Sequence, residues 1–142
     1  MSVINTATTA IIAALSAAPA VSATIDRVRL RPFGKTTVDA VVVTPTRSSA
    51  MDPPTLIGLP MAWETEIAVQ CLARVAGSSP DVAVDALLAS VYARIMSDPT
   101  LSGYVQSVSP IRVDYAYEAA DENIVCATLL LSVRVVTNSA NI

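Results

Sequence analysis

Histidine is absent from the sequence, which removes the commonest metal ligand and every catalytic scheme that uses an imidazole. The 4 glycines are scattered, so they form neither a dinucleotide-binding fingerprint nor a phosphate-binding loop. The nucleophile motif GxSxG is missing as well. We therefore expect no catalytic residues, no cofactor and no bound metal.

Cysteine is nearly absent too. The 2 cysteines, Cys71 and Cys126, do not form a CxxC pair, and both fall in the middle of segments that we expect to be strands. The simplest interpretation is two small apolar side chains that stay reduced in a cytoplasm. A disulfide would require the two strands to be neighbours, which the sequence does not establish.

Charged residues are scarce as well: they make up 15% of the sequence, whereas hydrophobic residues make up 53%. A free monomer usually carries more charge on its surface, so the shortage predicts surface that is buried against other subunits. The net charge of -3 argues against a general nucleic-acid binder, because such proteins carry a basic patch. The length of 142 residues fits one domain, residues 1–142.

The first segment, residues 2–23, is rich in alanine and carries no charge. Its apolar side chains recur at helical spacing, which predicts an amphipathic helix with Ser2 or Asn5 as its cap and Pro19 at its end. The alternative is a secretory signal that ends near Ala23, but the positively charged start of such signals is missing. The segment is too short and too polar to cross a membrane, so we expect no membrane association.

The most pointed charge pattern lies in residues 25–32, where three arginines alternate with other side chains. A strand here would place all three guanidinium groups on one face. A second predicted strand, residues 62–75, carries two glutamates on one face in the same way. Three interpretations stay open: a solvated strand face, a contact between these arginines and glutamates of neighbouring subunits, and phosphate binding, which the acidic net charge disfavours. The candidate subunit contacts are Arg27, Arg29, Arg31, Glu64 and Glu66.

Between these two segments, the predicted strand at residues 37–44 is apolar on both faces, which indicates a central position in a sheet. Residues 45–60 then hold four of the 9 prolines. We expect a long, projecting, proline-rich loop here, since loops of this length in compact domains are often functional. The candidate partner-contact residues in this loop are Arg47, Asp52, Pro53 and Pro54.

A helix is predicted over residues 80–96, with Ser79 as its cap and Pro80 in its first turn. Its apolar side chains form one stripe that a sheet can cover: Val84, Leu87, Leu88, Val91 and Ile95. The opposite face carries small uncharged residues, which permit close approach of another backbone. We expect either the first helix or a neighbouring subunit to pack against that face.

Residues 111–117 and 123–136 alternate as strands do, and a polar turn at 118–122 joins them into a hairpin. The second strand has a continuous core face formed by Val125, Ala127, Leu129, Leu131, Val133 and Val135. A short strand at 104–108 and a loose tail after residue 138 complete the chain. The order of elements predicts an α+β fold, with a mainly antiparallel sheet of about four to five strands and two helices packed on one face.

The helix and the hairpin together carry a resemblance to a known family. The helix that begins Ser79-Pro80-Asp81, the turn Asp98-Pro99-Thr100-Leu101 and the hairpin that begins Ile111-Arg112-Val113 resemble tail-terminator proteins of tailed bacteriophages, of the minor tail protein U type. The similarity covers the C-terminal half in residues and the whole chain in the order of its elements.

This resemblance implies a structural virion protein. Such a subunit forms a ring, a hexamer, that caps the tail tube, ends its polymerisation and joins it to the neck. The implied partners are other copies of the chain, the tail tube protein and a neck or connector protein, with DNA passing through the ring without specific binding. The implied location is the tail and neck of the virion, after assembly in the host cytoplasm.

Two alternatives stay open. The first is another neck component, either a head-completion protein or a tail tube protein; a tube protein would polymerise into stacked rings, whereas a terminator stops at one ring. The second is a small-molecule-binding module with a pocket between sheet and helices. That function needs convergent polar groups in the pocket, and the lack of histidine argues against it.

Overall fold

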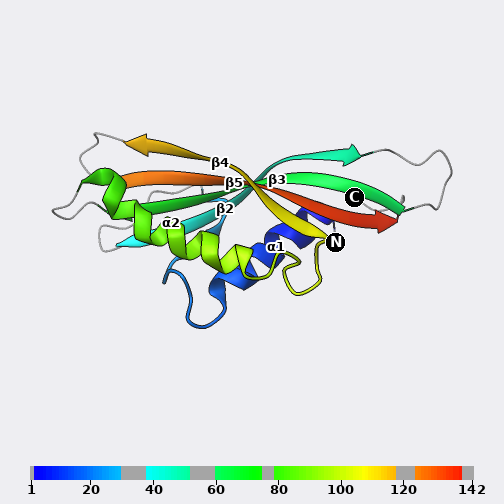
Figure 1. The fold of residues 1–142 in the computed structure, drawn as a ribbon, viewed down its shortest axis with the longest axis horizontal. Helices are drawn as coiled ribbons and strands as arrows, with labels where there is room; N and C mark the ends of the chain where they lie inside the picture. The colour runs from blue at the N-terminus through cyan, green and yellow to red at the C-terminus, as the bar shows by residue number, and fades with distance from the viewer. Residues whose placement is uncertain (1, 30–37, 52–59, 75–78, 118–123, 139–142) are drawn as a thin grey trace.

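The computed structural model describes residues 2–29, 38–51, 60–74, 79–117 and 124–138. The elements in chain order are α1 (Val3–Ser16), β1 (Ile25–Arg27), β2 (Asp39–Met51), β3 (Pro60–Arg74), α2 (Pro80–Met96), β4 (Ser107–Tyr117) and β5 (Ile124–Asn138). The strands form one sheet in the order β1-β2-β3-β5-β4, antiparallel except for the parallel β1–β2 pair. Both helices lie on the same side of this sheet (Figure 1), so the predicted α+β fold is confirmed.

A single core fills the space between the helices and the sheet. The stripe predicted on α2 is buried in full, and so is the predicted core face of β5. From α1 the core receives Val3, Ala7, Ala10, Ile11 and Leu15, and from β3 it receives Ile67, Val69, Cys71 and Ala73. Alternation on a strand and helical spacing on a helix therefore locate the core correctly here.

The helix ends follow the predicted caps only in part. Ser2 caps α1, since its side chain accepts a hydrogen bond from the Asn5 backbone N–H at 3.2 Å. Ser79 stands at the cap position of α2, but its hydroxyl makes no capping hydrogen bond. Pro80 opens α2 as predicted, and its fixed φ suits the first turn.

Arg94 joins the two helices. Its guanidinium donates to the backbone carbonyl oxygens of Ala14, Ala17 and Pro19 at 3.1, 2.8 and 2.6 Å. These carbonyls lie at the end of α1, where backbone acceptors lack helical partners. Arg94 thus fixes the end of α1 against α2.

Helix α1 does not cover the small-residue face of α2. The predicted packing of the first helix on this face is therefore wrong. Val82 is 60% exposed, and the other members of this face are exposed as well: Ala86, Ala89, Ser90 and Ala93. Packing of a neighbouring subunit on this face stays a prediction.

The strand predicted at residues 25–32 is much shorter, because β1 ends at Arg27. Val28 has a φ of 44°, in the left-handed region that breaks strand alternation. The predicted row of three arginines on one strand face is therefore wrong: Arg29 follows the break, and Arg31 lies outside the described residues.

The predicted loop at residues 45–60 is also wrong in its first part, because β2 continues to Met51 and pairs with β3 over that length. Arg47 belongs to this strand. Asp52, Pro53 and Pro54 lie outside the described residues. Figure 1 shows that the end of β2, the start of β3 and the end of β5 extend beyond both helices. We call this three-stranded part the projecting sheet.

Two prolines lie near the middle of the sheet, level with the centres of β3 and β5. Pro45 of β2 and Pro110 of β4 lie in one transverse row, which Ile67 and Leu131 complete between them. Directly after each proline the strand shifts its register against its neighbour. Proline has no N–H for the ladder, and such irregularities bend a strand and increase its twist. We call this row the proline row.

The C-terminal hairpin is confirmed, with one change. β4 is continuous from Ser107, where the sequence predicted a separate short strand before Pro110. The turn at 118–122 and the tail from residue 139 lie outside the described residues.

The two cysteines lie on neighbouring strands but on opposite faces of the sheet. Cys71 opposes Ala127, whereas Cys126 opposes Leu72. The thiols are not oxidised to a disulfide, and the register directs them apart. Burial, with a smaller contribution from Cys126, raises the pKa of the Cys71 thiol to about 12.

Candidate assembly surfaces

The side chains of Arg27 and Arg29 lie on different sides of the sheet. Arg27 opposes Val43 of the core face and donates a hydrogen bond from Nη1 to the side-chain oxygen of Asn5 in α1. Arg29 forms an ion pair with Asp26, whose register partner Val42 lies on the face away from the helices. They do not form the single basic surface that the sequence predicted.

The two candidate glutamates lie on the helix-free face of the sheet, at the start of β3. Glu66 forms an ion pair with Arg47 of β2. Glu64 accepts a hydrogen bond from Ser132 Oγ at 2.7 Å and stands opposite Arg134 of β5. The structure therefore gives both carboxylates partners within the chain, and it does not bring them to Arg27.

The helix-free face combines ion pairs with a small apolar area. The three described salt bridges all have a member on this face: Asp26–Arg29, Arg47–Glu66 and Arg112–Asp114. In the last, Asp114 accepts from Arg112 Nε at 2.8 Å, and this hydrogen bond raises the pKa of the guanidinium. Ala68 and Leu130 are buried between the pairs.

The outer strand β4 is the most exposed element of the sheet, and sequence reasoning missed it. Every residue from 109 to 117 is exposed, although β5 pairs with the whole strand. Tyr115 and Tyr117, on the same face of β4 as Val113, are 48% and 55% exposed. Pro110 could have indicated the edge position of β4 from the sequence, because proline inside a strand is typical of a sheet edge.

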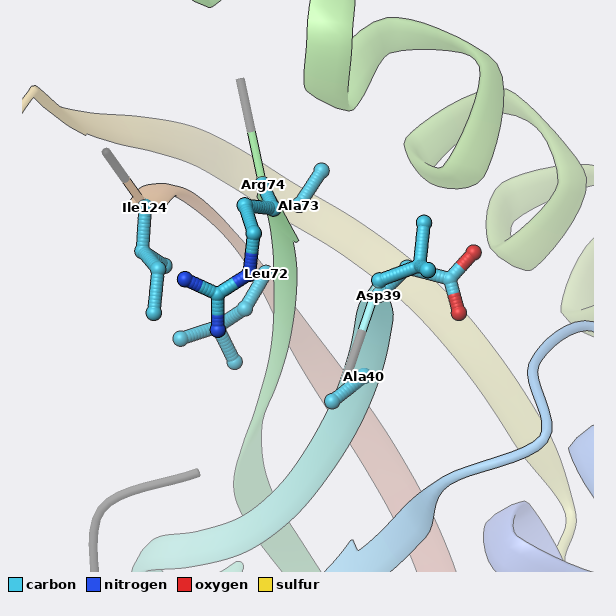
Figure 2. Close-up of a pocket in the computed structure, with 7 residues that line it drawn as sticks. Asp39, Ala40, Leu72, Ala73, Arg74 and Ile124 are labelled. Atoms are coloured by element: carbon cyan, nitrogen blue, oxygen red, sulfur yellow. The ribbon is translucent and has the colours of Figure 1, made fainter. Parts of the chain in front are cut away.

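The hollows on the surface do not resemble a ligand site. One lies at the end of the sheet between β2, β3 and β5 (Figure 2). Arg74 and Asp39 both line it, but Figure 2 shows that their side chains point away from each other, and Asp39 accepts a hydrogen bond from Ser22 at 2.6 Å. Two others follow the small-residue side of α2 next to residues 19–21. These linings lack the convergent polar groups of a binding pocket.

Metal-binding clusters and membrane-spanning helices are both absent from the described residues. Among them, no three Cys, Asp or Glu side chains gather in a way that could hold a metal ion. None of the described helices is long and apolar enough to cross a membrane.

Comparison with known proteins gives a likeness of fold. No protein-family model matches the sequence, and no curated protein matches it. Among solved structures, the chain is similar to one from the "Virion of native gene transfer agent (GTA) particle", with a TM-score of 0.52 and 12% sequence identity. The match covers 92% of this chain and 94% of that chain. The two chains thus share one fold over nearly their whole lengths.

Proposed function

We propose that this chain is a structural protein of a phage-like virion, and more specifically the subunit of a ring that caps the tail tube. The observation that carries the proposal is the whole-length likeness of fold to a chain from a gene transfer agent virion. The resemblance of α2, the following turn and the hairpin to tail terminators supports the finer assignment.

The surface of the molecule favours assembly over catalysis. Among the described residues, exposed apolar side chains gather on β4 and on the outer face of α2, whereas charged side chains such as Arg47 and Glu66, or Arg112 and Asp114, form ion pairs with each other. The projecting sheet extends beyond the helices (Figure 1). Exposed apolar patches of this kind mark contacts with other proteins.

The ring requires two different surfaces on each subunit, because a head-to-tail contact joins unlike patches. We propose the β1 edge as one surface, with Arg27 on its helix-bearing side and Arg29 on the opposite side, and Glu64 and Glu66 on the projecting sheet as the other surface. Their hydrogen-bond partners within the chain lie at or near the surface, so a neighbouring carboxylate or guanidinium can join each group. Such contacts fix the register of subunits more than their affinity.

In this proposal the ring is a hexamer that contacts the tail tube protein on one side and a neck or connector protein on the other. The chain is made in the host cytoplasm and becomes part of the tail and neck. DNA passes through the ring without specific recognition.

Electron microscopy of tails from particles produced with and without this chain tests the proposal. We expect tails of uniform length with a distinct end ring when the chain is present, and overlong tubes when its gene is deleted. Complementation with the wild-type gene should restore the length, which provides the control.

Other results would redirect the assignment. Tails of normal length without the chain, attached poorly to heads, would favour a head-completion protein. A complete loss of tubes would favour a tube subunit. Particles that are normal in every respect would overturn a structural role in the virion.

A further inference from the structure

The outer edge of β4 has the properties of a strand that accepts another strand. Within the described sheet β4 has one neighbour, β5, so its other side presents backbone N–H and C=O groups without a ladder. Natural edge strands are usually protected by proline, bulges or charge. Pro110 and the register shift protect the beginning of β4, but residues 112–117 pair regularly with β5 and contain neither.

The side chains of this edge are unusually apolar for exposed positions. Ile111, Val113, Tyr115 and Tyr117 are 45%, 37%, 48% and 55% exposed. The rings of Tyr115 and Tyr117 stack with their centroids 6.1 Å apart and an interplanar angle of 10°, so they form a flat wall along the strand. Leaving this area in water is unfavourable, and a second strand beside it would cover part of it.

We propose that this edge pairs with the same edge of a second copy of the chain, antiparallel, about a two-fold axis at Val113. Such an axis stands perpendicular to the sheet, so residues that face each other must lie on the same face. Val113 is the midpoint of the exposed residues 111–115, so this register pairs that segment with the same segment of the partner and leaves Pro110 outside the pairing.

Charge selects the same register. Arg112 and Asp114 lie on one face of the sheet, opposite Leu130 and Thr128 of β5. With the axis at Val113, Arg112 faces the partner's Asp114, and Asp114 faces the partner's Arg112. An axis at Arg112 or at Asp114 would instead place two like charges against each other, which destabilises a cross-strand pair.

The apolar side chains also match in this register. Val113 meets Val113 of the partner subunit at the axis, and Ile111 meets the partner's Tyr115. Pairs of β-branched and aromatic side chains stabilise antiparallel strands. The two sheets then form one continuous sheet with all helices on one side. This dimer does not depend on the proposed ring, since it uses a different edge and can exist before any particle assembles.

Charge inversion tests the dimer in the full-length protein by sedimentation velocity. The wild type should sediment as a dimer at high concentration. Arg112→Asp alone and Asp114→Arg alone should each weaken dimerisation by about tenfold or more, because each puts like charges at both symmetric contacts. An equimolar mixture of the two variants should recover the dimer, as should the double variant.

Arg47→Asp provides the matched control, since Arg47 is an equally exposed arginine of an ion pair on the same face but not on β4. It should leave the dimer intact. A monomeric wild type, single variants that still dimerise, or a mixture that stays monomeric would each overturn the proposal.

Cysteine cross-linking tests the register independently. In a Cys126→Ser background, Val113→Cys should form a disulfide-linked dimer on mild oxidation, because the position faces itself across the axis. Tyr117→Cys should not, since it lies four residues from the axis and does not face itself. Equal cross-linking at both positions would overturn the register, and absence of cross-linking at Val113 together with a monomeric wild type would overturn the dimer.

Discussion

At the scale of single residues, Arg94 has a larger structural role than its partly exposed position suggests. It donates to three backbone carbonyl oxygens at the end of α1, and hydrogen bonds from a charged donor are stronger than neutral ones. We expect Arg94→Ala to lower the free energy of unfolding by about 2–3 kcal/mol. Urea denaturation measures the loss.

Two variants test the origin of this effect. Arg94→Lys keeps the charge but loses the planar fork, so it should recover less than half of the loss. Arg47→Ala removes one member of an exposed ion pair and should cost less than about 1 kcal/mol. Equal effects of Arg94→Ala and Arg47→Ala would contradict the structural role of Arg94.

The Cys71 thiol should make stability depend on alkaline pH. Its pKa is raised from the ordinary value of 9.0 to about 12 because burial disfavours the thiolate. Between these two values the unfolded chain loses the proton and the folded chain keeps it, so stability falls as the pH rises from 9.0 towards 12. Cys71→Ala should reduce this slope by up to about 1.4 kcal/mol per pH unit.

Urea denaturation at several alkaline pH values gives the two slopes. Thiol labelling of the native wild type gives a second readout, because Cys126 is partly exposed and Cys71 is buried. Only Cys126 should react quickly. Rapid labelling of both thiols, or identical pH slopes for the wild type and Cys71→Ala, would show that Cys71 is not buried as described.

At the scale of elements, the caps of the two helices give a matched comparison. Ser2→Ala removes a side-chain hydrogen bond to a helical N–H and should destabilise the protein by about 1 kcal/mol. Ser79→Ala removes no such bond and should be nearly neutral. Thermal unfolding of both variants measures the difference, and a larger loss for Ser79→Ala would show that its hydroxyl caps α2 in solution.

The same scale shows where sequence reasoning succeeds. The bounds of α2 and the buried faces of α2 and β5 were predicted correctly, because burial imposes a clear period on side chains that lie against a core. β1 and β2 were predicted poorly. Val28 takes a left-handed φ without being glycine, and Pro45 stays within a strand because a register shift absorbs it. Both features depend on tertiary contacts that local composition does not report.

At the scale of the whole molecule, Arg29 tests the proposed ring. Arg29→Glu should reduce the share of tails with normal length, because it inverts one charge of a proposed subunit contact. The ion pair with Asp26 is partly exposed, with side chains 28% and 36% accessible, so the free energy of unfolding should fall by less than about 1 kcal/mol.

The double variant Asp26→Arg with Arg29→Glu separates assembly from folding. It restores an ion pair within the subunit but keeps the surface charges inverted. Assembly should therefore stay impaired while stability recovers. If the double variant restores normal tails, Arg29 acts through the fold of the subunit and not through a contact between subunits.

The candidate surfaces were harder to predict than the fold for a physical reason. Charge alternation at residues 25–32 indicated a basic face, but the direction of each side chain depended on where the strand ended. The exposure of β4 followed from the strand order, and strand order depends on pairings between distant parts of the chain. The alternation of Tyr115 and Tyr117 fits a buried face and an exposed face equally well, and the strand order decides between them.

The proline row has a geometric consequence. It crosses the sheet from β2 to β4, and the irregularity after each proline increases the local twist. Leu129 lies on one side of the row and Val133 on the other, so one hydrophobic core spans it. The row is therefore a crease at which the sheet turns above its core, and it sets the direction in which the projecting sheet leaves the helices (Figure 1). A partner that binds the projecting sheet meets a surface whose angle is fixed by the backbone at these two prolines.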